Sequence, residues 1–205
     1  MFRNIQHAGR AQKTDAWRAG AEKIRKLNSQ PWVIFAREWL HAPRLTGAVC
    51  PSSCALAKAM ADYVPDGTGL VVDLGAGTGA VVAALLKKGI PARRIVAVEQ
   101  SAQLARYLRG RFPEIAVLRG DAAKLSRLLP KGSVDCVVSS LPLVSLPQAK
   151  REAVVRELKL VLQGRPLVQF SYLWGGAFLV HNGLMCISST LVLKNLPPAR
   201  VMKFV

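Results

Sequence analysis

The stretch Val71-Val72-Asp73-Leu74-Gly75-Ala76-Gly77-Thr78-Gly79 decides how this chain folds. Its first half is apolar apart from Asp73, which predicts a buried strand, and three glycines at alternate positions follow it. The next segment, residues 80–88, has helical periodicity and stops at Gly89. Glycine adopts positive φ at little cost and lets a ligand approach the backbone. A glycine-rich turn between a strand and a helix therefore predicts a ligand-binding loop of an α/β domain.

Strands and helices alternate from this loop to the end of the chain. Apolar runs predict strands at residues 70–74, 94–99, 115–119, 134–139, 167–172, 184–193 and 200–205. Helices are predicted at residues 52–63, 80–88, 102–110, 122–129 and 148–162. This alternation predicts the α/β fold class, with a mostly parallel, doubly wound, Rossmann-like sheet. Residues 173–183 are short for a crossover helix, so we expect the last units to be abbreviated.

One apolar segment requires a choice between a membrane span and a protein core. Residues 166–193 contain no Lys, Arg, Asp or Glu, and this length is sufficient to cross a bilayer. Polar residues and glycines interrupt the segment: Gln169, Gly175, Gly176, His181, Asn182 and Gly183. We therefore interpret it as two core strands joined by an apolar loop.

Three carboxylates near the expected strand ends identify the ligand of the glycine loop. The glycines alone also fit the dinucleotide pattern G-x-G-x-x-A. Asp73, however, precedes the first glycine, where it would repel a pyrophosphate and accept a cationic amino acid. Glu99 ends the next strand, at the distance along the chain expected of a residue that binds ribose hydroxyls. Asp121 follows the third strand, where a carboxylate can accept a hydrogen bond from an adenine amine.

Together these features resemble the class I methyltransferases that use S-adenosyl-L-methionine (AdoMet) and release S-adenosyl-L-homocysteine. By that resemblance the glycines line the methionine and ribose, Glu99 binds the ribose hydroxyls, and Asp121 binds the adenine. The cofactor-binding residues that we expect are Asp73, Gly75, Ala76, Gly77, Gly79, Glu99, Gln100, Asp121, Ala122 and Ser139. We expect no metal site, because no cluster of Cys and His completes a zinc-binding set around Cys50 and Cys54.

The segment Ser139-Ser140-Leu141-Pro142-Leu143 ends the fourth strand, which faces the transferred methyl group in this class. Adenine N6-methyltransferases, including the rRNA adenine dimethylases, have Asn-Leu-Pro followed by an aromatic residue here. Ser140 replaces the Asn and Leu143 replaces the ring, so the platform on which a base would stack is lost. An rRNA adenine N-methyltransferase remains the alternative interpretation, supported by the charge of the chain and the Leu-Pro element.

Over nearly its whole length the chain resembles the bacterial phospholipid N-methyltransferases. The residues that carry this resemblance are Phe35, Arg37, Trp39, Pro43, Thr46-Gly47-Ala48, Pro51-Ser52-Ser53, Leu56-Ala57, Met60, Ser139–Leu143, Val168–Tyr172 and Asn195–Val201. The resemblance implies N-methylation of a phospholipid amine, phosphatidylethanolamine towards phosphatidylcholine. An ornithine-lipid amine is chemically acceptable as well.

The amine that accepts the methyl group must be neutral and close to the cofactor, yet the segment Ser139–Leu143 contains no acid. Tyr172, at the end of the fifth strand, is our candidate to orient the amine, although a tyrosine that only packs at a strand end fits equally well. The backbone carbonyls of Ser140 and Leu141 are alternative acceptors. His41 and His181 are weaker candidates, because a lone histidine is usually structural.

The charge of the chain indicates a polyanionic partner. The net charge is +17 and the pI about 10.5. Trp17, Ala21, Ile24 and Leu27 fall on one helical face and basic residues fall mostly elsewhere, which predicts a basic amphipathic helix. A helix that packs on its own domain fits the same pattern.

We therefore expect two parts: residues 1–45 as N-terminal docking and lid helices, and residues 46–205 as the methyltransferase domain. We expect a monomer in the cytoplasm, bound peripherally to the inner face of the cell membrane. Its cysteines are expected to be reduced, with Cys136 packed as a small apolar residue.

Overall fold

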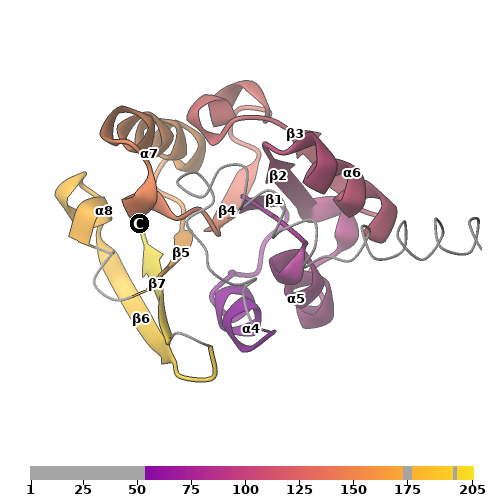
Figure 1. Ribbon diagram of the computed structural model, residues 1–205, viewed down its shortest axis with the longest axis horizontal. Coiled ribbons are helices and arrows are strands. Elements are labelled where there is room, and N and C mark those ends of the chain that lie inside the picture. The colour runs from indigo at the N-terminus through magenta and orange to yellow at the C-terminus, as the bar shows by residue number, and fades with distance from the viewer. Residues whose placement is uncertain (1–53, 173–176, 196–197) are drawn as a thin grey trace, which may run out of the picture.

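The computed structural model describes residues 54–172, 177–195 and 198–205, and Figure 1 shows the arrangement of their helices and strands. The strands are β1 (Leu70–Leu74), β2 (Ile95–Glu99), β3 (Ala116–Arg119), β4 (Val134–Ser139), β5 (Leu167–Tyr172), β6 (Cys186–Val192) and β7 (Ala199–Phe204). The α-helices are α4 (Cys54–Asp62), α5 (Ala80–Lys88), α6 (Ala102–Arg111), α7 (Gln148–Leu162) and α8 (Ala177–His181). Short 3₁₀ turns are η1 (Ala92–Arg94), η2 (Ala122–Arg127) and η3 (Leu143–Ser145).

One seven-stranded sheet has the order β3-β2-β1-β4-β5-β7-β6. The first five strands in this order pair in parallel, whereas β7 is antiparallel to both β5 and β6. The chain moves outward from β1 in one direction to β3 and then returns to β4 on the other side. The carboxyl ends of β1 and β4 therefore meet at a topological switch point, where open α/β sheets bind ligands.

Helices cover both faces of the sheet (Figure 1). The apolar residues of α4, α5 and α6 pack in one buried cluster, and those of η2, α7 and α8 pack in another. Alternation along β1 explains the separation, because Val71 contributes to the first cluster while Val72 and Leu74 contribute to the second. The α/β fold class and the mostly parallel, doubly wound sheet predicted from the sequence are thus confirmed.

Several predicted boundaries are also confirmed. Strands β1, β4 and β5 and helices α5 and α7 begin and end at the predicted residues. Cys136 is fully buried, as predicted, and burial raises the pKa of its thiol to about 12. The expected helices of residues 1–45, and with them the boundary between residues 1–45 and 46–205, lie outside the described residues.

Three expectations were wrong in detail. Residues 122–127 form a 3₁₀ turn that includes a non-helical residue, Lys124, instead of a short α-helix. The expected loop at residues 173–183 contains the five-residue helix α8. The strand expected at residues 184–193 is not a core strand, because β6 lies at the edge of the sheet and all its residues except Val192 are exposed. Within the described residues, no helix has the length and hydropathy needed to cross a bilayer.

Candidate active site at the carboxyl edge of the sheet

The glycine loop joins β1 to α5 at the centre of this edge. The backbone N–H groups of Gly75 and Ala76 both donate to the carbonyl of Val98 in β2, which fixes the loop against the neighbouring strand. Gly75 and Gly79 have φ values of +76° and +83°. A Cβ atom at Gly75 would lie 2.7 Å from the side chain of Leu141, and one at Gly79 would overlap Phe112. These two positions therefore require glycine for both conformation and space.

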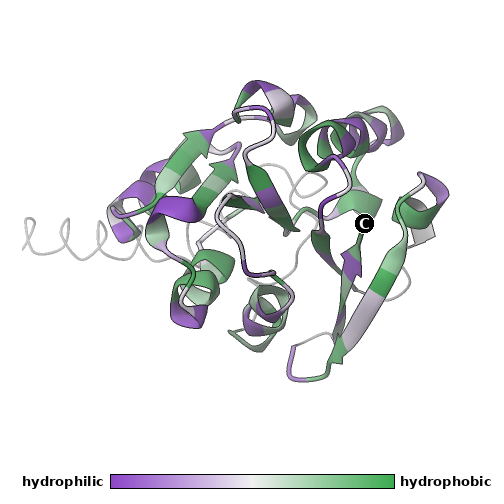
Figure 2. Ribbon diagram, turned by 180° about the vertical axis from the view of Figure 1, so that it is seen from behind, coloured by the Kyte–Doolittle hydropathy of each residue, from purple (hydrophilic) through white to green (hydrophobic). Residues whose placement is uncertain are grey.

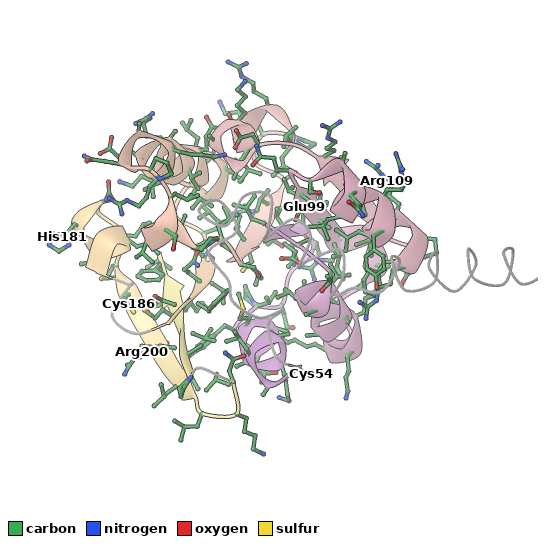
Figure 3. All side chains as sticks on the ribbon, viewed as in Figure 1. Cys54, Glu99, Arg109, His181, Cys186 and Arg200 are labelled. Carbon is green, nitrogen blue, oxygen red and sulfur yellow. The ribbon has the colours of Figure 1, made fainter. Side chains whose placement is uncertain are left out.

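Glu99, which the sequence predicts to bind the ribose hydroxyls of the cofactor, also holds the glycine loop in place. It is buried at the end of β2, in the interior of the molecule (Figure 3). Its Oε2 accepts a hydrogen bond of 2.9 Å from the N–H of Gly77, and its Oε1 accepts one of 2.8 Å from the N–H of Ser101. A carboxylate has about four acceptor sites, so these two bonds leave capacity for ribose hydroxyls.

Asp73 is a buried carboxyl with a strongly raised pKa. It is fully buried, and neither carboxyl oxygen has a hydrogen-bond partner there. Burial, and secondarily the negative charge of Glu99, raises its pKa to about 8, while the backbone N–H of Val82 acts in the opposite direction. A buried carboxyl without a partner fits a cationic ligand, and AdoMet carries both an ammonium and a sulfonium group. Asp73 therefore supports the fit of the loop to this cofactor.

Lys150, which the sequence analysis did not predict as a site residue, contacts both Asp121 and Gln100. Lys150, in the first turn of α7, lies 3.6 Å from Oδ1 of Asp121 and donates to Oε1 of Gln100 over 3.3 Å. The same Oδ1 accepts the N–H of Ala123. Asp121 and Ala122, which were predicted to bind the adenine, are both half-buried. The contacts of Asp121 with Ala123 and Lys150 both involve Oδ1, so the prediction assigns the adenine amine to Oδ2.

The segment Ser139–Leu143, at the end of β4, lies next to the glycine loop. Buried Ser139 accepts the N–H of Leu141 through its Oγ at 3.4 Å, and the N–H of Ser140 donates to the carbonyl of Leu74. The carbonyl of Leu141 accepts two hydrogen bonds, from the N–H of Leu143 at 2.9 Å and from Nε2 of Gln169 at 3.0 Å. Both lone pairs of this carbonyl are thus used, so it is a poorer acceptor for a substrate amine than our sequence analysis assumed.

The sequence analysis assigned Gln169 no role in the site. It lies in β5 with 3% of its surface exposed, and its Nε2 also donates to the carbonyl of Phe170 at 2.8 Å. Its Oε1 is buried without a partner among the described residues. An amide side chain in the middle of a mostly apolar strand was the available signal. Tyr172 ends β5, and its backbone pairs with Ala199. His181 is exposed at the end of α8, away from the strand ends described above (Figure 3).

Comparison with known proteins agrees with this geometry. Residues 71–164 match a family described as a methyltransferase domain. The ornithine lipid N-methyltransferase of Singulisphaera acidiphila is 33% identical over 136 residues, which cover 63% of this chain and 71% of that protein.

Solved structures give the same fold at low sequence identity. TrmN from Thermus thermophilus superimposes with a TM-score of 0.62 and 20% identity over 78% of this chain, which spans 51% of the TrmN chain. A TehB-like AdoMet-dependent methyltransferase from Corynebacterium glutamicum gives 0.55 and 17%, covering 83% and 95% of the two chains. The glycopeptide N-methyltransferase MtfA in complex with AdoMet gives 0.58 and 14%, covering 76% and 95%.

The loop, the three carboxylates and these relatives lead to one assignment. The chain belongs to the AdoMet-dependent methyltransferases with a Rossmann-like fold, in the family that includes the ornithine lipid N-methyltransferase of Singulisphaera acidiphila.

Proposed function

We propose that this methyltransferase transfers the methyl group of AdoMet to the primary amine of a membrane lipid. The observation that carries the proposal is the position of Leu143. Where adenine methyltransferases carry the ring that stacks on the base, Leu143 is only 5% exposed and packs in the buried cluster beneath α7. Position 143 therefore provides no aromatic ring on which an adenine would stack. The kinship with a lipid N-methyltransferase points to a lipid amine as the substrate class.

Phosphatidylethanolamine is the substrate that we favour, through to phosphatidylcholine, because the resemblance to phospholipid N-methyltransferases extends along the chain. An ornithine lipid is the second candidate, since the relative with 33% identity is named for that substrate. Both lipids present a primary amine on a short flexible group, so the segment Ser139–Leu143 can bind the amine of either lipid.

The chemistry of the site is chiefly alignment. AdoMet supplies an activated methyl group on a sulfonium, and the protein must hold a neutral amine in line with it. In our proposal the carbonyl or hydroxyl of Ser140 accepts an N–H of the amine, since the carbonyl of Leu141 is already occupied. Tyr172 ends the neighbouring strand and remains the candidate to orient the amine or to accept a hydrogen bond from it.

Substrate access requires contact with a membrane surface. We propose that the basic amphipathic segment around Trp17–Leu27 binds anionic headgroups at the cytoplasmic face, with the enzyme acting as a monomer. The positive charge of this segment suits the role, because Lys and Arg near an anionic membrane are attracted to its headgroups. Salt screens this attraction and weakens it.

RNA is the competing substrate, and the net charge of +17 is the observation in its favour. A direct experiment separates the two. The protein is incubated with AdoMet labelled on the methyl group, together with vesicles of phosphatidylethanolamine, vesicles of ornithine lipid, or rRNA. We expect label in the lipid extract of one or both vesicle reactions. Label confined to RNA would overturn the proposal.

A further inference from the structure

The C-terminal quarter of the chain has an unusual charge distribution. From residue 158 to residue 205 the sequence contains no Asp or Glu, whereas it contains five basic residues: Lys159, Arg165, Lys194, Arg200 and Lys203. All twelve acidic residues of the chain lie before residue 158. The positive potential of α8, β6 and β7 is therefore not balanced by acids of the same segment.

The same segment exposes large aliphatic side chains. Met185, Ile187, Leu191 and Leu193 are 62%, 48%, 52% and 71% exposed. Strand β6 carries no charged residue, and Figure 2 shows it green at its ends and pale between. An uncharged edge strand with exposed aliphatic side chains is normally covered by a partner, because its N–H and C=O groups and its apolar surface are otherwise left to water.

The two faces of β6 differ in what covers them. Tyr63, which follows α4, lies over one face, where its hydroxyl makes hydrogen bonds of 2.9 Å with Ser188 and 2.8 Å with Thr190. On the other face Leu191 pairs with Arg200 of β7, and the guanidinium of Arg200 reaches Oγ of Ser189 at 3.2 Å. Exposed aliphatic and basic groups therefore lie side by side on this second face.

The β6–β7 hairpin also has a defined position relative to the active site. Ala199 of β7 pairs with Tyr172 at the carboxyl end of β5 and with Val192 at the end of β6. The turn between the two strands, which carries Leu193 and Lys194, consequently extends from the same edge of the sheet as the glycine loop and Ser139. A membrane or protein surface that contacts this turn therefore faces the same edge of the sheet as the segment Ser139–Leu143, where we propose that the substrate amine binds.

We propose that the hairpin surface, made of Ile187, Leu191, Leu193, Lys194 and Arg200, docks on an anionic lipid bilayer. This inference rests on the proposed function and adds a docking site on the folded domain to the one proposed for the N-terminal segment. The aliphatic side chains enter the interfacial region, while Lys194 and Arg200 contact anionic headgroups. The carboxyl edge of the sheet then faces the membrane, so a lipid amine reaches Ser140 without leaving the bilayer.

A second copy of the chain is a less suitable occupant. Edge-to-edge pairing of two β6 strands would bring the basic residues of both hairpins together without any acid from residues 158–205 to neutralise them. An anionic lipid surface satisfies the aliphatic and the basic residues at once.

The test compares surface variants with matched controls on other parts of the molecule. The apolar variant combines Ile187→Ser, Leu191→Ser and Leu193→Ser, and its control is Leu160→Ser on α7, where the leucine is 60% exposed.

The charge variant combines Lys194→Gln and Arg200→Gln, and its control combines Arg106→Gln and Lys131→Gln, both exposed. Figure 3 shows Arg200 on the opposite side of the molecule from Arg109 of α6, the helix that carries Arg106.

Full-length proteins are sedimented with vesicles of phosphatidylglycerol and phosphatidylcholine, and with vesicles of phosphatidylcholine alone. We expect the apolar variant to lower binding to the anionic vesicles about tenfold and the charge variant to weaken the salt dependence, of which the N-terminal segment retains a part, with both controls unchanged. AdoMet affinity should stay the same in all variants, which verifies that they fold.

The outcomes separate docking from catalysis. Vesicle binding that equals that of the unmodified protein in both hairpin variants would overturn the docking site. So would a lack of vesicle binding by the unmodified protein, or a dimer that these variants dissociate without any effect on vesicle binding. If binding depends on the hairpin but no lipid is methylated, the docking site stands and the proposed function fails.

Discussion

Gln169 donates a hydrogen bond of 3.0 Å from its Nε2 to the backbone carbonyl of Leu141, and this bond joins the middle of β5 to the loop after β4. The side chain of Leu141 in turn occupies the space that a Cβ at Gly75 would need. Gln169 therefore fixes a loop that contacts the cofactor turn on one side and that, in the proposed function, faces the substrate amine on the other.

Replacing Gln169 with Met should lower kcat about tenfold or more while AdoMet affinity changes little. Met has similar volume but cannot donate to Leu141 or Phe170, and a lost buried hydrogen bond costs about 1–3 kcal/mol. The measurement is steady-state kinetics together with AdoMet titration. Leu167→Met in the same strand, which removes no hydrogen bond, is the control. An equal loss of cofactor affinity and no change in kcat would assign Gln169 to the cofactor site instead.

The raised pKa of Asp73 predicts that the cofactor-free protein loses stability as pH rises. In the unfolded chain the carboxyl ionises near its ordinary pKa of 3.8, whereas in the folded protein it stays protonated up to about pH 8. The folded state binds the extra proton between these values, so the free energy of unfolding should fall from about pH 4 to about pH 8 and then level off. Thermal unfolding at a series of pH values measures this. Asp73→Asn should flatten the decline, and an identical pH profile in the variant would refute the assignment.

The same ionisation should be linked to cofactor binding. Because AdoMet is cationic, it favours the ionised Asp73, and binding below pH 8 should release a proton that Asp73→Asn does not release. Calorimetry in two buffers with different ionisation enthalpies gives the number of protons released.

Glu99→Ala should weaken AdoMet binding by about one to a few kcal/mol, because buried ribose hydroxyls lose a charged acceptor. The structure adds a second cause, since Glu99 also holds the N–H groups of Gly77 and Ser101. Asp121→Ala should have a smaller effect, because an adenine amine offers it a single donor. Calorimetric titration of both variants tests this order, and the reverse order would contradict the assigned roles.

Gly79→Ala should destabilise the fold more than Gly89→Ala. Both glycines have positive φ, +83° and +94°, so both substitutions incur a backbone cost of about 1–2 kcal/mol. A Cβ at Gly79 would also meet Phe112 and Leu108, whereas nothing lies within 4 Å of one at Gly89. Urea unfolding of the two variants gives the comparison, and equal losses would mean that Phe112 moves away freely.

The parts of this account that the sequence could predict are those that depend on local pattern. The acids at the ends of β1 and β2 and the glycine turn are close together along the chain, so Asp73 and Glu99 could be placed by their distance from strand ends. The contact of Gln169 with Leu141 depends on which strands become neighbours, and local periodicity does not contain that information. Residues 184–193 looked like a core strand for the same reason. Their apolar composition is real, but the sheet order puts β6 at the edge.

The most direct test of the central claim, methyl transfer to a lipid amine, is mass spectrometry of the lipids after reaction with AdoMet that carries a deuterated methyl group. Reactions with the unmodified protein and with Glu99→Ala are compared on vesicles that contain phosphatidylethanolamine or ornithine lipid. The account predicts deuterated methyl groups on the headgroup nitrogen, strongly reduced with Glu99→Ala. Unlabelled headgroups in both lipids, with deuterated methyl groups found in rRNA under the same conditions, would contradict it.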